Sequence, residues 1–361
     1  MSSPGALEPV TSGTGDLVSA AAQRGELAMQ AVGLNRSYRL GRGAVLRAAR
    51  DVTFNLYRGA VVALVGESGS GKSTVAKLLA GQEKPTGGSV TLDGRPVDVS
   101  SRTAFRRYKS EVQLVFQDPF SSLNPVHTVR YHLQRPVKLH QGKKSRDEIE
   151  AEVVSLMEQV RLTPAQQFLA KFPHELSGGQ RQRVSFARAL AARPSVLLAD
   201  EPVSMLDVSI RLEMLNLLDD LRKDFHLALL YITHDIASAR YFADEVLVMY
   251  AGEIIERGPA EQVTQRPAHP YTQLLVSSAP DPDNLGSVLQ SGARRGTRVP
   301  ESSGRIVDGC PFYPRCPLAE DRCRAQRPPL IRISSSRAAA CWRLDVAAPE
   351  LLGDGVNPEG L

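Results

Sequence analysis

The chain has 361 residues, of which 42% are hydrophobic and 23% are charged, a composition typical of a globular protein with a sizeable core. Its net charge of +5 is mildly basic, but the arginines are spread along the chain, so charge alone does not indicate a nucleic-acid or membrane surface. No stretch approaches the roughly 18 consecutive apolar residues of a membrane span, and the start lacks the basic and apolar run of a signal peptide. We therefore expect the chain to remain in the cytoplasm.

The first part of the chain is predicted to contain a tail followed by short strands. Residues 1–25 are rich in Ser, Gly, Ala and Thr, which predicts a disordered tail. Short strands are expected near residues 27–34 and 51–56. Residues 89–92, followed by an Asp-Gly turn, predict a β-hairpin.

Residues 61–74 form an apolar run that leads into a glycine-rich loop, a lysine and two hydroxyls. They fit the pattern G-x-x-x-x-G-K-[ST], in which a strand ends in a loop whose N–H groups cradle phosphates and a helix follows. We expect Lys72 to reach the β and γ oxygens and Ser73 to hold Mg²⁺. The motif alone predicts only that this loop binds a nucleotide. Its predicted contacts are Gly66, Ser68, Gly69, Ser70, Gly71, Lys72, Ser73 and Thr74.

Beyond the apolar run 112–116, the periodicity is helical from about residue 124 to 192. Ser145 and Glu148 have the spacing of a capping box. Strands and helices then alternate, which predicts a mostly parallel sheet with crossover helices. Residues 280–305 are predicted to be a flexible linker. The alternating segments are strands at 196–199, 228–232 and 245–249 and helices at 210–225 and 236–242.

Two further segments carry groups suited to phosphate chemistry. The apolar strand that begins at Val196 ends in Asp200 and Glu201, where ligands of open α/β sheets bind. Asp200 is placed to hold Mg²⁺, and Glu201 is placed to polarise an attacking water. Residues 177–180, Ser-Gly-Gly-Gln, open a helical run and offer free N–H groups, a second phosphate-binding geometry.

These motifs, in this order, resemble the ATP-binding subunits of ABC transporters over about residues 27–260. Two further side chains match that family: Gln117 resembles the Q-loop glutamine and His234 resembles the switch histidine. The resemblance implies that Gln117 contacts Mg²⁺ or the attacking water, and that His234 holds the γ-phosphate or Glu201. Tyr38 resembles the aromatic residue that stacks on adenine, with a core tyrosine as the alternative.

The resemblance also implies a fold, cofactors and an activity. The fold is an α/β P-loop NTPase with a mixed sheet core, a helical subdomain at about 124–192 and a small cysteine-containing extension. The implied cofactors are ATP and Mg²⁺, and the implied reaction is hydrolysis of ATP to ADP and phosphate. In this family the phosphate site is completed by a facing subunit. The residues that would do so are Ser177, Gly178, Gly179 and Gln180.

All four cysteines lie between residues 310 and 341, and such a local cluster in a reducing compartment favours a metal over a disulfide framework. With residues 268–272, Ala-His-Pro-Tyr-Thr, the cluster resembles the C-terminal extension of ATPases of oligopeptide, dipeptide and nickel importers. The resemblance favours a [4Fe–4S] cluster, while Zn²⁺ and free or disulfide-linked cysteines stay open. The candidate ligands are Cys310, Cys316, Cys323 and Cys341.

We therefore expect an ATP-hydrolysing, peripheral subunit on the cytoplasmic face of the membrane that powers peptide import. The implied partners are a second ATPase subunit, identical or paralogous, two membrane permeases and a solute-binding protein, with no nucleic acid. Coupling to the permeases is expected through Gln117 and residues 118–126. The transported substrate stays open.

One alternative is a soluble ABC-type ATPase that acts on DNA or ribosomes, and another is an export ATPase. The short separation of Gly66 from Ser177 is transporter-like and disfavours the first. The cysteine extension and the lack of a fused membrane domain disfavour the second. The predicted divisions are a tail at 1–25, an ATP-binding domain at 26–260, an extension at 261–350 and a flexible tail at 351–361.

Overall fold

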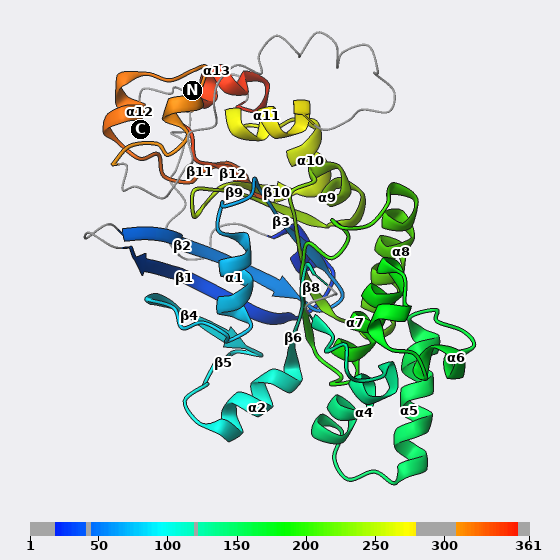
Figure 1. The fold of residues 1–361 in the computed structure, drawn as a ribbon. Helices are drawn as coiled ribbons and strands as arrows, with labels where there is room; N and C mark the ends of the chain where they lie inside the picture. Colours follow the sequence, from blue (N-terminus) through cyan, green and yellow to red (C-terminus); the bar gives the residue numbers. More distant parts are fainter. Residues whose placement is uncertain (1–18, 41–44, 119–121, 279–307, 353–361) are drawn as a thin grey trace.

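We describe a computed structural model, which covers residues 19–40, 45–118, 122–278 and 308–352 (Figure 1). Most of the predicted N-terminal tail, the predicted linker 280–305 and most of the predicted C-terminal tail lie outside these residues. Among the helices in these ranges, none is both long enough and apolar enough to cross a membrane.

The centre of the molecule is an eight-stranded mixed sheet in the order β11-β12-β10-β9-β3-β8-β7-β6. Its middle strands pair in parallel, and every residue of β3, β7, β8 and β9 is buried, as expected for strands covered on both faces. The mixed sheet predicted from the sequence is therefore confirmed. The parallel strands are β3 (Val61–Val65), β6 (Val112–Val115), β7 (Val196–Asp200), β8 (Ala228–Thr233) and β9 (Glu245–Tyr250).

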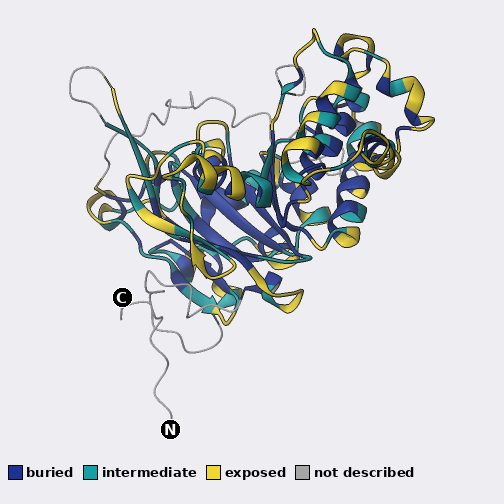
Figure 2. Cartoon of the chain, turned by 90° about the horizontal axis from the view of Figure 1, so that it is seen from below, coloured by how far each residue is buried: buried dark blue, intermediate teal, exposed yellow. Residues whose placement is uncertain are grey.

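Strand β3 divides its side chains between two hydrophobic clusters. Val61, Ala63 and Val65 pack in one cluster, whereas Val62 and Leu64 pack in the other. Because successive strand residues point to opposite faces, an all-apolar strand needs a core on each side. Figure 2 shows the buried strands enclosed by more exposed elements. Crossover helices on this sheet are α1 (Lys72–Leu79), α8 (Val208–Asp224) and α9 (Ile236–Phe242).

A second, antiparallel sheet has the order β2-β1-β4-β5. The predicted hairpin is confirmed, since Leu92 pairs with Arg95 across the Asp-Gly turn. Its first two strands extend well beyond the predicted short segments, because they pair with each other over most of their length. The strands are β1 (Leu27–Arg39), β2 (Val45–Tyr57), β4 (Gly87–Leu92) and β5 (Arg95–Pro96).

The predicted helical region is confirmed, and its helices lie together beside the main sheet (Figures 1 and 2). The capping box is also confirmed: Ser145 Oγ accepts from the Glu148 N–H at 3.2 Å, and the Glu148 carboxylate accepts from the Ser145 N–H at 2.7 Å. These pairs satisfy N–H groups that the first helical turn leaves free. The helices of this region are α4 (Val129–His140), α5 (Arg146–Gln159), α6 (Ala165–Leu169) and α7 (Gly178–Leu190). Helix α2 (Arg102–Glu111) precedes β6 and lies outside the predicted range.

The C-terminal region continues the central sheet, which the sequence did not indicate. In β12, Ala338 and Ala339 pair antiparallel with Arg257 and Glu256 of β10. These elements gather at one end of the molecule in Figure 1. They are β10 (Glu253–Pro259), α10 (Ala260–Gln265), α11 (Pro270–Ser278), α12 (Asp321–Ala325), β11 (Ile331–Ser334), β12 (Arg337–Ala339) and α13 (Leu344–Ala347). Short 3₁₀ helices lie at Ala20–Gln23, Pro173–Glu175, Tyr313–Arg315 and Pro349–Leu351.

Candidate functional site

The glycine-rich loop connects the end of β3 to α1 and approaches neighbouring backbone too closely for side chains at two positions. A Cβ at Gly66 would lie 2.2 Å from the Met249 carbonyl oxygen. A Cβ at Gly71 would lie 2.1 Å from the Ala48 carbonyl oxygen, and its φ of +107° is one that side-chain-bearing residues rarely adopt. The loop can therefore wrap tightly only with glycine at these positions.

Lys72 and Ser73, at the start of α1, present a cation and a hydroxyl at this loop. Lys72 Nζ donates to the carbonyl oxygens of Gly66 at 2.7 Å and Glu67 at 2.9 Å, and burial lowers the pKa of Lys72. Ser73 Oγ donates to Asp200 Oδ1 at 3.2 Å, and burial raises the pKa of Asp200. A hydroxyl and a carboxylate are hard oxygen ligands of the kind that Mg²⁺ prefers. Ser73 and Asp200, two of the three predicted Mg²⁺ ligands, thus lie side by side.

Three polar side chains meet at the adjacent strand ends. Gln117 Nε2 donates to Glu201 Oε2 at 3.0 Å, and His234 Nδ1 lies 3.1 Å from the same oxygen. Glu201 has a φ of 47°, in the left-handed region that is uncommon for residues other than glycine. Such strained backbone is concentrated at functional sites. The three residues predicted to be catalytic therefore form one hydrogen-bonded group.

These groups open onto one cavity of about 740 Å³. Tyr38 lines this cavity, and the Arg36 guanidinium lies 4.7 Å from the Tyr38 ring centroid. Gly66, Ser70 and Asp200 do not line the cavity, and the buried Ser70 Oγ has no hydrogen-bond partner among the described residues. The predicted site residues that line the cavity are Tyr38, Ser68, Gly69, Gly71, Lys72, Ser73, Thr74, Gln117, Glu201 and His234.

The Ser-Gly-Gly-Gln segment lies elsewhere, at the N-terminus of α7. Ser177 Oγ accepts from the Gln180 N–H at 3.3 Å, and the Gln180 side chain accepts from the Ser177 N–H at 3.0 Å, which makes a capping box. Ser177, Gly178, Gly179 and Gln180 are all absent from the lining of the cavity. One chain therefore brings together the loop and the carboxylates but not this second set of N–H groups.

The four cysteines do come together, around one small pocket beside His269. All four are free thiols, and burial raises the pKa of Cys310 to about 11 and of Cys341 to about 12. Four thiols suit a soft metal centre in kind. As arranged here, no set of three or more His, Cys, Asp or Glu side chains in the described ranges forms a metal site. The four cysteines therefore lie together as predicted. Their side chains, as placed among the described residues, do not form a metal site.

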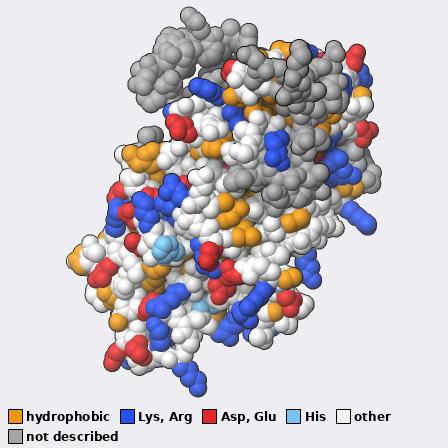
Figure 3. Space-filling model, turned by 180° about the vertical axis from the view of Figure 1, so that it is seen from behind, with side chains coloured by type: hydrophobic (Ala, Val, Ile, Leu, Met, Phe, Trp, Pro, Cys, Tyr) orange, Lys and Arg blue, Asp and Glu red, His pale blue; other side chains and the backbone are white. Residues whose placement is uncertain are grey.

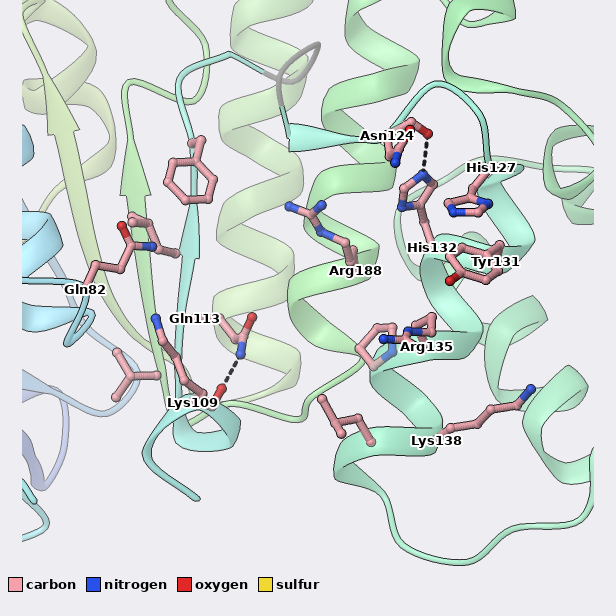
Figure 4. Close-up of a pocket in the computed structure, with 15 residues that line it drawn as sticks. Gln82, Lys109, Gln113, Asn124, His127, Tyr131, His132, Arg135, Lys138 and Arg188 are labelled. Carbon is pink, nitrogen blue, oxygen red and sulfur yellow. Dashed lines mark hydrogen bonds between the residues drawn. The ribbon is translucent and has the colours of Figure 1, made fainter. Parts of the chain in front are cut away.

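A second groove of about 730 Å³ runs between α4 and the β6 strand with the end of α2 (Figure 4). Its described lining contains no Asp or Glu and includes four basic side chains. His127 stacks on Tyr131 with ring centroids 3.8 Å apart, and His132 is held by the Asn124 carbonyl oxygen at 3.0 Å. Phe116, which precedes Gln117, also lines this groove. The basic side chains are Lys109, Arg135, Lys138 and Arg188.

Sequence reasoning missed three residues at the glycine-rich loop. Glu67 lies within the loop, its carboxylate accepts from Arg315, and its N–H donates to Tyr271 Oη. A carboxylate inside a phosphate-binding loop was a signal in itself, because it requires a cationic partner if it is not to repel the ligand. The identity of that partner could not be read from the sequence.

Comparisons with known proteins agree with this geometry. Residues 49–204 match the family described as ABC transporter. Residues 255–323 match the family described as oligopeptide/dipeptide transporter, C-terminal region. The second match includes three of the four cysteines.

Similar individual proteins extend over most of the chain. The di/tripeptide transport ATP-binding protein DppF of Pseudomonas aeruginosa is 41% identical over 88% of this chain and 97% of its own length. The oligopeptide transport ATP-binding protein OppF of Salmonella typhimurium is 39% identical over 83% of this chain and 89% of its own.

Solved structures of ATP-binding cassettes share the fold of about two thirds of the chain. The structure of cbiO1 from Clostridium perfringens, part of the ABC transporter complex cbiONQ, matches with a TM-score of 0.59 and 30% identity over 66% of this chain and 91% of its own. The cassette MJ0796, a dimer bound to ADP and phosphate, matches with a TM-score of 0.58 and 29% identity over 64% of this chain and 98% of its own.

Proposed function

The chain belongs to the ABC transporter family of ATP-hydrolysing subunits, and we propose that it powers peptide import through a membrane transporter of the dipeptide and oligopeptide class. One observation carries the catalytic part: Gln117 and His234 both contact the Glu201 carboxylate at the mouth of the phosphate loop. The peptide class is supported by the match of residues 255–323 to the oligopeptide/dipeptide transporter region.

We propose the following division of labour for ATP hydrolysis. The loop N–H groups and Lys72 bind the phosphates and offset their charge. Glu201 accepts a proton from the attacking water, while Gln117 and His234 hold the Glu201 carboxylate in place. Ser73, Gln117 and Asp200 would hold Mg²⁺, which would supply charge neutralisation for the bound phosphates. Burial raises the pKa of Asp200, and a neighbouring divalent cation would lower this pKa again by stabilising the carboxylate.

We propose that Ser177, Gly178, Gly179 and Gln180 complete the phosphate site of a second ATPase subunit, identical or paralogous. Their absence from the lining of the cavity in their own chain supports this arrangement. The similar cassette MJ0796 is described as a dimer with ADP and phosphate bound. Met205, which follows the Glu201 strand end, is 58% exposed and offers apolar surface for such a contact.

We propose that the basic groove takes a segment of a membrane permease that carries acidic side chains. Its four cations have no acidic side chain among the residues that line it, which favours an anionic partner surface. Phe116 joins this groove to Gln117, so a docked segment would lie one residue from the catalytic group. The rest of the proposed assembly is a second permease and a solute-binding protein, with this subunit peripheral on the cytoplasmic face.

The alternative of a soluble ATPase acting on DNA or ribosomes has less support. The similar proteins from Pseudomonas aeruginosa and Salmonella typhimurium are named for peptide transport. On the face seen in Figure 3, Lys and Arg side chains are interspersed with Asp and Glu and form no continuous basic surface.

We propose that the cysteine pocket takes a soft metal centre, either a [4Fe–4S] cluster or Zn²⁺, as the resemblance to peptide importers implies. Support comes from four free thiols that line one pocket. A bound metal would favour the thiolates that burial alone disfavours.

The test of import is peptide uptake by cells that lack this chain. We expect uptake of a labelled dipeptide or short oligopeptide to fall, to return with the wild-type chain, and to stay low with the Glu201→Gln variant. Uptake that is unchanged by the deletion would contradict peptide import. Co-sedimentation of the chain with ribosomes or DNA, and not with membranes, would favour the alternative.

A further inference from the structure

Glu67, the second residue of the phosphate loop, is bound at every one of its polar groups. Its carbonyl oxygen accepts from Lys72 Nζ at 2.9 Å. Its N–H donates to Tyr271 Oη at 2.9 Å. Its carboxylate accepts two parallel hydrogen bonds from Arg315, at 2.8 and 2.9 Å. Such a two-pronged guanidinium–carboxylate pair fixes orientation as well as position.

Two of these partners come from the C-terminal region, far along the chain. Arg315 follows Glu67 by 248 positions and Tyr271 follows it by 204. Tyr271 is fully buried and lies 4.6 Å from Tyr250 and 5.5 Å from Phe312, measured between ring centroids. The Arg315 guanidinium lies 5.7 Å from the Phe312 ring centroid. Tyr271 and Arg315 are therefore held by a packed aromatic cluster.

The charges make this anchor relevant to nucleotide binding. Glu67 lines the same cavity as Lys72, so an unpaired carboxylate there would repel a triphosphate. The Arg315 guanidinium donates to both carboxylate oxygens of Glu67, at 2.8 and 2.9 Å, so that the two opposite charges are paired at hydrogen-bond distance. Arg315 thus offsets the negative charge of Glu67 in the cavity and fixes the position of the Glu67 side chain. Tyr271 binds the backbone of the same residue and helps to hold the loop in its phosphate-binding shape.

We propose that Arg315 and Tyr271 are positioning residues for the phosphate loop, and that the C-terminal region thereby sets the affinity of this chain for ATP. The proposal rests on ATP binding at that loop. It assigns a role to the turn between Cys310 and Cys316 that does not depend on what the cysteines bind. Any change that moves this turn would also move the anchor of Glu67.

The first test is the Arg315→Ala variant of the full-length chain. We expect the Kd for ATP to rise about tenfold, because a charge-assisted pair is lost and a bare carboxylate is left facing the phosphates. In the assembled transporter we expect KM for ATP to rise similarly, with kcat changed less than about twofold. Tyr271→Phe, which removes only the hydroxyl that binds the loop, should raise the Kd about threefold.

The second test separates charge from folding. Adding Glu67→Ala to Arg315→Ala should return the Kd to within about threefold of wild type, because the repelling carboxylate is gone. Glu320→Ala is the matched control: it breaks the Arg343–Glu320 pair, 2.9 Å long and in the same region, without touching the loop. Thermal unfolding of each variant monitors stability.

An Arg315→Ala variant that binds ATP like the Glu320→Ala control would overturn the proposal. So would a double variant that binds no better than Arg315→Ala, since Arg315 would then act only through the fold of the C-terminal region. Failure of the wild-type chain to bind ATP would instead contradict the proposed function.

Discussion

At the scale of single residues, Glu201 shows how the fold presents a carboxylate. It follows the buried strand β7 in a left-handed backbone conformation, which costs about 1 kcal/mol for a residue with a side chain. Its N–H donates to the Ile232 carbonyl oxygen at 2.9 Å, which links it to β8. In this conformation the Glu201 carboxylate contacts both Gln117 and His234.

Replacing Glu201 by Gln should reduce ATP turnover at least about 100-fold, since the amide cannot accept the proton of the attacking water. ATP binding should persist, because the loop and Lys72 remain, and the closed dimer should accumulate. Turnover and nucleotide binding are measured on the same preparation. Glu158→Gln, on the exposed side of α5, is the control and should turn over normally. Undiminished turnover in Glu201→Gln would remove Glu201 from the role of base.

Two loop glycines should respond differently to alanine. Gly71→Ala should abolish nucleotide binding or lower stability by more than about 2 kcal/mol, because its Cβ would lie 2.1 Å from the Ala48 carbonyl oxygen. Gly69→Ala meets nothing within 4 Å and should cost only about 1 kcal/mol for its positive φ. Equilibrium unfolding and ATP affinity distinguish the two. Equal effects would mean that backbone conformation, and not the close approach, requires glycine.

At the scale of elements, the groups that act on the nucleotide lie at strand ends, whereas the Ser-Gly-Gly-Gln segment lies at the start of a helix. Asp200 ends β7, and loop 66–71, Glu201 and His234 follow the carboxyl ends of β3, β7 and β8, so that all lie at the same ends of the parallel strands. Gln117 follows β6 at the same edge. The helical region instead supplies α7, whose N-terminus is capped by Ser177, and α4, which forms one wall of the basic groove. Each element therefore has a separate task.

The capping box of α5 should contribute to stability alone. Ser145→Ala removes the acceptor for the Glu148 N–H and should lower the free energy of unfolding by about 1 kcal/mol. Denaturant titration measures this change. Ser155→Ala, in the middle of the same helix, should be neutral or slightly stabilising because alanine favours helix. ATP turnover should be unaltered in both, and a loss of turnover in Ser145→Ala would show that α5 also influences the nucleotide site.

Reversing charge in the basic groove should detach the chain from its membrane partners. Arg135→Glu with Lys138→Glu replaces two of the four cations, so an acidic permease segment would be repelled. We expect membrane co-sedimentation with the permeases to fall severalfold while ATP binding by the purified chain is retained. Arg95→Glu, exposed on β5 outside the groove, is the control. Normal membrane association of the double variant would rule out this groove as the docking surface.

At the scale of the whole molecule, the C-terminal region and the ATP-binding core share one sheet. The β12–β10 pairing is reinforced by an ion pair between Arg337 and Glu256, 2.8 Å long, with side chains 3% and 0% exposed. Glu256 also accepts from the N–H groups of Ala268 and His269 at 2.9 and 2.8 Å. Breaking this pair would strand a buried charge, so the two parts should unfold together. The division at residues 260 and 261 stays a prediction.

The metal hypothesis for the cysteine pocket has a direct test. Protein purified without oxygen should contain about four iron atoms and four sulfides per chain and absorb broadly near 400 nm if a cluster is present. Zinc without iron would establish the alternative. A Cys341→Ser variant should lose the metal, whereas a change at the exposed Arg324 should not. A metal-free protein with normal peptide import would contradict both forms of the hypothesis.

Much of the site could be predicted from local sequence because its chemistry is carried by short segments. The run at 61–74 encodes a strand, a turn and a helix start, and Asp200 and Glu201 end an apolar strand. These patterns depend on neighbours in the chain, so periodicity and residue type are sufficient to recognise them. The helical region and the alternating strands were predictable for the same reason.

Tertiary structure decided what no local pattern contains. It brings Arg315 and Tyr271 to Glu67, adds β12 to the edge of β10, and forms the basic groove between α4 and β6. Each depends on contacts between distant segments, whose pairing is set by how the whole core packs. The sequence by itself therefore determined a nucleotide-binding loop and the carboxylates beside it. Only the packed chain decided that Tyr271 and Arg315 of the C-terminal region bind Glu67 in that loop.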